Sequence, residues 1–181
     1  MPTVLNHIAF VVPDLDATPR LAELGLTIGP AESFPREGTT EVYVGDGPGR
    51  ILLMRPDAPG PYARALVRRG PGLHHVALDV PDLDAFVDDT VRGTGWLLHP
   101  ISLQTRRQSA TIWLARPGVA ALVEVRETTR PPTGPSVVER VAIQGLATHP
   151  SCGRLFDGLT VPIVGGPVSA IVVGTQTLDL S

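Results

Sequence analysis

Cysteine is nearly absent from this sequence, which has 181 residues and a single thiol at Cys152. One cysteine cannot form an intramolecular disulfide or a cysteine-based zinc site, and such sparing use is typical of a reducing compartment. No apolar run reaches the roughly 18 residues of a membrane span, and the N-terminus has no charged segment leading to a small-residue cleavage site. We therefore expect a cytoplasmic protein with no membrane-embedded part and no export signal.

Positive charge is also limited. The formal net charge is −3, and the densest basic cluster consists only of Arg64, Arg68 and Arg69. Such a chain has no cationic field that would attract nucleic acid, so we expect a small-molecule partner instead. The hydrophobic content of 43% is enough for a sizeable core in one domain or two small modules. The frequent use of Ala, Val, Arg, Pro and Gly indicates a GC-rich bacterial source.

One motif occurs twice. Residues 6–17 and 74–86 each contain a histidine, an apolar run and the sequence Pro-Asp-Leu-Asp-Ala. In both copies the apolar run predicts a strand, which Pro-Asp ends. Asp14 and Asp82 are the predicted N-caps of the helices that follow. Each copy therefore begins with a strand, a turn and a helix.

Proline and glycine mark the predicted helices. The first helix is expected to be short, with Pro19 interrupting it and Gly25 ending it. The second is expected over residues 83–92, with Gly93 ending it. A further helix over residues 61–69 is predicted to link the two copies.

Three short segments of β-branched or alternating residues follow the first helix of each copy, separated by Gly and Pro. They are residues 26–30, 39–46 and 50–56 in the first copy and residues 96–102, 109–118 and 120–127 in the second. The repeat therefore predicts an α+β fold of two βαβββ modules, residues 1–60 and 73–128, joined by residues 61–72. Two such modules are expected to curl into a half-open β cleft.

The composition changes after the second module. Residues 129–136 form a linker rich in Pro and Thr, and residues 137–181 form a β-rich C-terminal extension. Its pattern of strand, short helix and two strands fits either an incomplete third module or an unrelated edge hairpin. In both cases we expect ordered, strand-rich structure that packs on the core, because the segment is too apolar to remain solvated, and that covers a sheet edge or one mouth of the cleft.

The repeat also places particular side chains together. His7 and His75 occupy the same inward-facing position of their modules, and alignment of the last strands sets Leu52 opposite Glu124. Two imidazoles and a carboxylate are suitable ligands for a divalent metal. We predict a site of His7, His75 and Glu124, either an open metal site or one that has decayed, in which Leu52 supplies no ligand. His74 is expected on the opposite face, solvated or capping.

The repeated motif, and above all the segment YARALVRRGPGLHHVALDV at residues 62–80, resembles the vicinal oxygen chelate (glyoxalase/bleomycin-resistance/dioxygenase) superfamily. Within it the sequence is most similar to methylmalonyl-CoA epimerases, over about residues 4–127. The resemblance implies metal ligands at His7, His75 and Glu124. The epimerases have a fourth ligand at the position that matches Leu52, so this leucine is a departure from their pattern. The resemblance also implies an acid/base glutamate that Glu37 matches best.

A second departure from the epimerase pattern lies in residues 100–110. The corresponding epimerase loop is rich in glycine, whereas this one carries Arg106, Arg107 and Gln108. The substrate is therefore left open between an acyl thioester and a secondary metabolite.

The leading functional prediction is an isomerase or epimerase that acts alpha to a carbonyl through a metal-stabilised enolate. Its cofactor would be Co²⁺, Mn²⁺, Ni²⁺, Zn²⁺ or Fe²⁺, and its acid/base residues would be Glu37 and Glu124. Two alternatives stay open. One is a metal-free module that binds, cyclises or rearranges a small molecule, and the other is a non-haem iron oxygenase. The sequence leaves the oligomeric state, including a homodimer, undecided.

Overall fold

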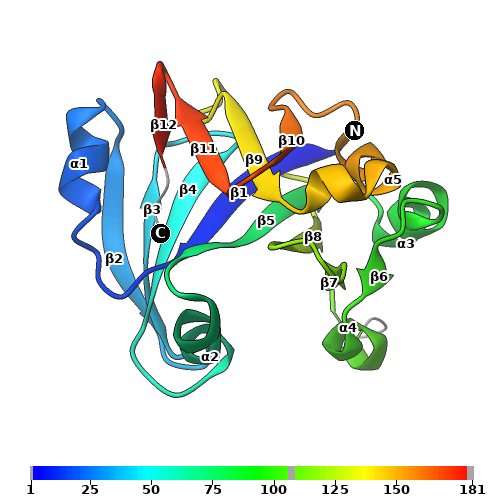
Figure 1. Cartoon of the computed structure of the whole chain (residues 1–181), viewed down its shortest axis with the longest axis horizontal. Coiled ribbons are helices and arrows are strands. Elements are labelled where there is room, and N and C mark those ends of the chain that lie inside the picture. The colour runs from blue at the N-terminus through cyan, green and yellow to red at the C-terminus, as the bar shows by residue number, and fades with distance from the viewer. Residues whose placement is uncertain (1, 106–108, 179–181) are drawn as a thin grey trace.

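The computed structural model describes residues 2–105 and 109–178. Eight strands form one curved sheet in the order β2-β3-β4-β1-β5-β8-β7-β6, which Figure 1 shows from β2 on the left to β6 on the right. The strands are β1 (Val4–Val11), β2 (Ile28–Phe34), β3 (Thr39–Val44), β4 (Arg50–Pro56), β5 (Gly72–Val80), β6 (Leu97–Leu98), β7 (Thr111–Ala115) and β8 (Leu122–Glu127).

The two halves of this sheet have the same topology. In the first half β1 is parallel to β4, and β4, β3 and β2 pair antiparallel in turn. In the second half β5 is parallel to β8, and β8, β7 and β6 pair antiparallel in turn. The halves join where β1 and β5 pair antiparallel, which relates them by a pseudo-twofold axis. The predicted α+β fold of paired βαβββ modules is confirmed, and both modules share one continuous sheet.

Short helices connect the strands. They are α1 (Thr18–Glu23), α2 (Pro61–Arg69), α3 (Leu83–Ala85) with its π-helical continuation η1 (Phe86–Val91), and α4 (Pro100–Thr105). The linking helix α2 has the predicted bounds because Pro61 lies in its first turn and Gly70, at φ 77°, ends it. Among the helices of residues 2–105 and 109–178, none has the length and apolar character needed to cross a membrane.

One of the two predicted helix caps is present. The Asp82 carboxylate accepts the N–H of Ala85 at 2.8 Å and so caps α3. The prediction for Asp14 is wrong, because its carboxylate accepts the N–H of Asp16 at 3.0 Å in the turn that precedes α1. Pro19 does not interrupt α1 but lies in its first turn, where an N–H would have no intrahelical partner.

The predicted strand over residues 96–102 is largely wrong. Only Leu97 and Leu98 pair with β7, and the chain then turns into α4 at Pro100. Proline is well suited to the first turn of a helix, which explains the early change. The Ser102 hydroxyl accepts the N–H of Trp113 at 2.6 Å and ties α4 to β7.

The central strands have two different faces. The face that carries His7 and His75, here called the cleft face, also carries a small apolar cluster that includes Leu52 and Tyr62 of α2. The opposite face, here called the back face, is fully apolar at its centre. Its buried side chains include Leu5, Ile8, Phe10, Val76 and Leu78. The large core of the protein therefore lies behind the cleft.

The C-terminal extension folds as a second sheet in the order β10-β9-β11-β12. Its elements are β9 (Arg140–Gln144), the short helix α5 (Pro150–Gly153), β10 (Ile163–Gly166), β11 (Ala170–Val173) and β12 (Gln176–Leu178). Its first strand is parallel to its second, whereas in both modules the first strand is parallel to the last. The extension is thus a separate sheet that does not repeat the topology of the modules.

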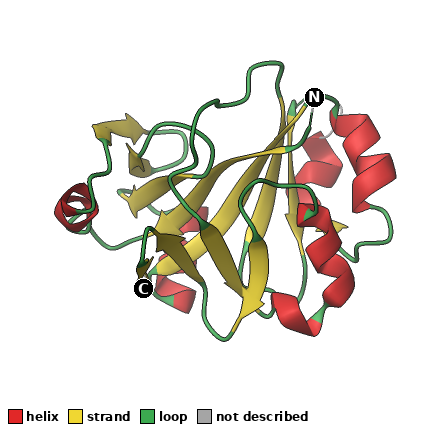
Figure 2. Ribbon diagram, turned by 90° about the horizontal axis from the view of Figure 1, so that it is seen from above, coloured by secondary structure: helices red, strands yellow, loops and turns green. Residues whose placement is uncertain are grey.

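This second sheet packs on the back face. Val141, Ile143 and Ile171 are fully buried and belong to the same apolar core as the back-face side chains. Seen from above, the sheet lies in front of the longer strands of the main sheet (Figure 2). The indole N–H of Trp96 donates to the carbonyl of Cys152 at 3.0 Å and joins the second module to α5. The prediction of ordered structure packed on the core is confirmed, whereas the expected cover of a sheet edge or a mouth of the cleft is wrong.

Candidate metal centre

The predicted ligand residues meet on the cleft face. His7 lies on β1, His75 on β5 and Glu124 on β8, three strands that are neighbours in the sheet. The Nε2 atoms of His7 and His75 are 3.1 Å apart. The Glu124 Oε2 atom lies 3.7 Å from the first of these nitrogens and 3.6 Å from the second. Three side chains from distant parts of the sequence thus converge on one point.

The spacing of these atoms suits a divalent ion. Metal–nitrogen and metal–oxygen bonds of about 2.0–2.2 Å place adjacent ligand atoms roughly 3–3.6 Å apart. The three separations, 3.1, 3.6 and 3.7 Å, lie close to this range. Two imidazoles and one carboxylate are also a donor set that Zn²⁺, Co²⁺, Ni²⁺, Mn²⁺ and Fe²⁺ accept. His7, His75 and Glu124 can therefore bind such a cation with one ligand atom each.

A hydrogen-bond chain orients the His7 ring. The Asn6 amide N–H donates to the Asp79 carboxylate at 2.6 Å, so the Asn6 oxygen faces His7 and accepts from its Nδ1 at 2.8 Å. Arg126 holds the same Asp79 carboxylate through its Nε and Nη2 atoms, at 3.0 and 2.9 Å. Because His7 Nδ1 carries the proton, the lone pair of its Nε2 points toward His75 and Glu124.

His74 differs from its predicted role. Its side chain is buried, and its Nδ1 lies 2.9 Å from Nδ1 of His75. Its ring also contacts the ring of Tyr62, with centroids 5.0 Å apart. The prediction of an opposite face assumed regular alternation, but the pairing of β1 with β5 shifts register beside His75. His74 is therefore part of the centre's surroundings, which sequence reasoning missed.

Burial keeps the two ligand imidazoles neutral. Burial first, and then Arg126 and Arg50, lower the pKa of His7 to about 3. Burial and the neighbouring imidazoles hold the pKa of His75 well below its usual range. Burial raises the pKa of Glu124 to about 7, although Arg126 opposes this shift. At neutral pH both histidines offer lone pairs, and their contacts with Glu124 are not charged ion pairs.

A cavity of about 190 Å³ opens onto these groups. Besides the three ligand residues, its walls include Tyr43, Trp113 and the guanidinium-bearing Arg126. The Trp113 ring stands edge to face against His75, with centroids 5.0 Å apart. A cavity of this volume would hold a small molecule or one end of a larger one.

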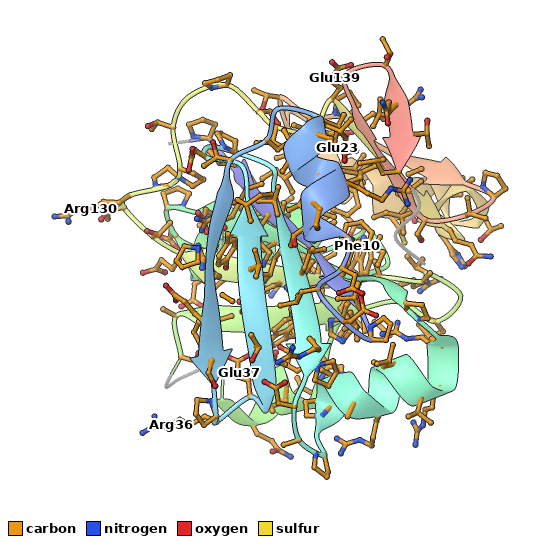
Figure 3. The ribbon with its side chains drawn as sticks, turned by 90° about the vertical axis from the view of Figure 1, so that its left-hand side faces the viewer. Phe10, Glu23, Arg36, Glu37, Arg130 and Glu139 are labelled. Atoms are coloured by element: carbon orange, nitrogen blue, oxygen red, sulfur yellow. The ribbon has the colours of Figure 1, made fainter. Side chains whose placement is uncertain are left out.

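Two further glutamates line the same cavity. Glu37, the residue predicted as acid/base, lies at the tip of the β2–β3 hairpin, where Figure 3 shows it, and its carboxylate accepts the Tyr62 hydroxyl at 3.2 Å. Glu41 lies inside β3 and is only 8% exposed; burial raises its pKa, against a 2.8 Å hydrogen bond from the Thr39 hydroxyl. Sequence reasoning missed Glu41. Alternation along β3, which puts it on the same face as Tyr43, is the signal that would have found it.

Comparison with known families identifies the superfamily to which the chain belongs. Residues 6–100 match the model of the Glyoxalase/Bleomycin resistance protein/Dioxygenase superfamily, the vicinal oxygen chelate proteins. This match covers more than half of the chain. The chain belongs to this superfamily.

Epimerases are among its relatives in the superfamily. The ethylmalonyl-CoA/methylmalonyl-CoA epimerase of Cereibacter sphaeroides is 31% identical over 88 residues, which are 46% of this chain and 66% of that enzyme. The human mitochondrial methylmalonyl-CoA epimerase is 32% identical over 89 residues, or 47% of this chain and 51% of the human protein. The chain thus spans between half and two thirds of the length of these relatives.

A solved structure agrees with these sequence matches. The methylmalonyl-CoA epimerase of Mycobacterium tuberculosis superimposes with a TM-score of 0.53 at 25% identity, covering 70% of this chain and 89% of that one. The superposition leaves part of this chain uncovered, and that part is long enough to contain the additional C-terminal sheet, which the two-module fold does not include.

As predicted, position 52 of this vicinal oxygen chelate protein carries a hydrocarbon side chain and supplies no ligand. Leu52 lies on β4 directly beside Ala9 of β1, lines the cavity and is 3% exposed. It packs with Met54 and Tyr62 in the apolar cluster of the cleft face. A leucine has no lone pair to offer, so this side of the centre is closed by apolar contact.

The predicted departure at Arg106, Arg107 and Gln108 lies outside the described residues. The elements on either side of it, α4 and β7, belong to the second module.

Proposed function

We propose that the protein is an epimerase- or isomerase-like enzyme that moves a proton at the carbon alpha to a carbonyl, with an acyl thioester as the substrate class. The observation that carries this proposal is the presence of two carboxyl groups, the buried Glu41 and the partly buried Glu124, in one cavity with His7 and His75. The similarity to acyl-CoA epimerases supports the same reaction.

The three converging side chains form the cofactor site of the proposal. A divalent cation bound by His7, His75 and Glu124 would stabilise the negative charge that develops on the carbonyl oxygen as the alpha proton leaves. The neutral imidazoles supply lone pairs to it without first losing a proton. Asn6 holds the His7 ring through a contact with Nδ1 of His7, and His74 holds the His75 ring through a contact with Nδ1 of His75.

The acid/base pair of the proposal is Glu41 and Glu124. In the order of the strands, Glu41 on β3 and Glu124 on β8 stand on either side of His7 and His75. Burial raises the pKa of both carboxyl groups, so each exchanges protons closer to neutral pH than an exposed glutamate does. One would remove the alpha proton from one face of the substrate, and the other would return a proton to the opposite face.

Glu37 has a lesser part in this proposal than the sequence predicted. Its carboxylate accepts the Tyr62 hydroxyl, and the residue is exposed at the hairpin tip. We propose that Glu37 borders the entrance and that Glu41 exchanges the proton.

Solvent deuterium exchange tests this division of roles. With methylmalonyl-CoA as the probe, Glu41→Gln and Glu124→Gln should each slow exchange of the alpha proton by about 100-fold or more, the usual contribution of a general acid or base. Glu37→Gln should slow it by less than about tenfold. Glu23→Gln, an exposed carboxyl on α1, serves as the matched control.

The outcomes separate the candidates. Exchange that is slowed more by Glu37→Gln than by Glu41→Gln would restore the role predicted from the sequence. Exchange that survives both Glu41→Gln and Glu124→Gln would overturn the proposal, and turnover that requires dioxygen would favour an oxygenase.

A metal-free binding or rearranging module is the second candidate. Leu52 occupies a wall of the centre, and two cations, Arg50 and Arg126, act on His7 strongly enough to lower its pKa. These charges would also disfavour a third cation nearby and would attract an anionic ligand instead. Calorimetric titration with Co²⁺ decides between the two: binding that disappears in His7→Ala supports the first candidate, and the absence of binding to the wild type supports the second.

A further inference from the structure

The pairing of β1 with β5 contains two bulges at equivalent places. Leu5 pairs with Leu78 and His7 with Ala77, so Asn6 is the extra residue on β1. On the other strand, Ala9 pairs with His75 and Phe10 with Leu73, which makes His74 the extra residue on β5. Asn6 and His74 therefore hold the same position in the two modules, directly before the two ligand histidines.

A bulge changes where side chains point. In a regular strand consecutive side chains face opposite sides, whereas an extra residue re-aims its own side chain. Here both extra residues turn toward the ring that follows them: Asn6 Oδ1 lies 2.8 Å from Nδ1 of His7, and His74 Nδ1 lies 2.9 Å from Nδ1 of His75. Both contacts are buried, so neither is replaced by water.

In the first module the proton positions follow from the partners. Asp79 is ion-paired with Arg126, and a carboxylate only accepts hydrogen bonds, so the Asn6 amide N–H points to it. The Asn6 oxygen then accepts from His7 Nδ1, and His7 Nε2 keeps a lone pair.

In the second module two arrangements satisfy the 2.9 Å contact between His74 and His75, and the first of them also satisfies the 3.1 Å contact between His75 and His7. In one, His75 carries its proton on Nε2 and donates to His7 Nε2 across 3.1 Å, while its Nδ1 accepts from a proton on His74 Nδ1. In the other, His75 carries its proton on Nδ1 and donates to His74 Nδ1, and His74 carries its own proton on Nε2. Only the second arrangement leaves a lone pair on His75 Nε2 for a cation.

We propose that His74 is a positioning residue whose Nδ1 accepts the Nδ1–H of His75 and so turns the His75 Nε2 lone pair toward a bound cation, as Asn6 does for His7. Each ring keeps one proton: on His75 it moves from Nε2 to Nδ1, and on His74 from Nδ1 to Nε2, with no net proton released. This inference rests on the proposed binding of a divalent cation.

Metal affinity in matched variants is the first test. His74→Phe keeps a ring against Tyr62 but removes the acceptor, and it should weaken Co²⁺ binding by about 10- to 100-fold, as is usual for the partner of a ligand. His74→Asn copies the arrangement of Asn6 and should bind Co²⁺ close to the wild-type level. His149→Phe removes a histidine outside the centre and is the control. Thermal unfolding of the metal-free variants shows that each is folded.

Tautomer assignment in the wild type is the second test and needs no variant to fold. Nitrogen-15 shifts of the imidazoles should place the protons of His74 on Nδ1 and of His75 on Nε2 in metal-free protein. Added Zn²⁺ should move them to Nε2 of His74 and Nδ1 of His75. Such a change of tautomer is one that a merely structural role for His74 would not produce.

The outcomes distinguish this inference from the proposed function. Wild-type binding of Co²⁺ with equal affinity in His74→Phe, or a His74 proton that stays on Nδ1 when Zn²⁺ is bound, would overturn the role of His74 and leave the metal centre intact. No binding of Co²⁺ to the wild type would overturn both.

Discussion

At the scale of single residues, Leu52 limits how tightly the centre would hold a cation. Its side chain lines the cavity beside the ligands and contributes only apolar contact. A centre with three protein ligands relies on water or substrate for its remaining positions, which makes bound metal easier to lose than in a four-ligand site.

Leu52→Glu should therefore strengthen Co²⁺ binding by about tenfold or more, the change that roughly 1.4 kcal/mol from one added ligand produces. Without metal, the new carboxyl group would be buried without a partner, so the free energy of unfolding of the metal-free variant should fall. Calorimetric titration and urea unfolding measure the two effects. An unchanged Co²⁺ affinity would show that position 52 does not reach the cation.

At the scale of elements, the repeated motif folds differently in its two copies. In the second copy Asp82 caps α3, whereas in the first copy Asp14 closes a turn before α1 and leaves the helix without a side-chain cap. Pro19 in the first turn of α1 compensates for part of this, since its ring already holds the helical φ.

The two aspartates form a matched pair for measurement. Asp82→Ala should lower the free energy of unfolding by about 1 kcal/mol, the usual cost of losing a side-chain N-cap. Asp14→Ala removes only a turn contact, so its effect should be clearly smaller. Urea unfolding of the two variants measures the difference, and equal losses would contradict the assignment of the cap to α3 alone.

At the scale of the whole molecule, the C-terminal sheet completes the core. The back face carries large apolar side chains such as Phe10 and Leu78, and Val141, Ile143 and Ile171 pack in the same core. A large apolar side chain contributes about 1.5–3 kcal/mol when it is fully buried, so several such residues outweigh the stability of a small domain.

Truncation after Glu127 should therefore leave a protein that aggregates or unfolds without a cooperative transition. A second truncation after Gly174 removes β12, whose residues are largely exposed, and should keep a cooperative transition at a slightly lower temperature. Differential scanning calorimetry and size-exclusion chromatography compare the two. A stable, soluble protein ending at Glu127 would show that the back face does not need this cover.

The amino-acid sequence alone determined the features that depend on nearby residues or on the repeat. Alternation and Pro/Gly punctuation set β4 at residues 50–56 and α2 at residues 61–69, and the duplicated motif was enough to group His7, His75 and Glu124 in one site. Local patterns suffice here because the side-chain period of a helix or strand, and the Pro and Gly residues at its ends, belong to the segment itself. Two similar modules also place equivalent residues around one axis.

Tertiary structure alone decided what depends on pairing between distant strands. Where β1 meets β5, the register adds one extra residue on each strand and turns Asn6 and His74 toward the ligand rings, against the alternation that each strand would show by itself. Pairing within the β2–β3 hairpin leaves Glu37 exposed at its tip and buries Glu41 in the cavity. The position of the second sheet is determined by its packing against the back face and not by a signal within the C-terminal segment. Burial of apolar surface is not directional, so only the assembled core shows which face of the main sheet is left uncovered.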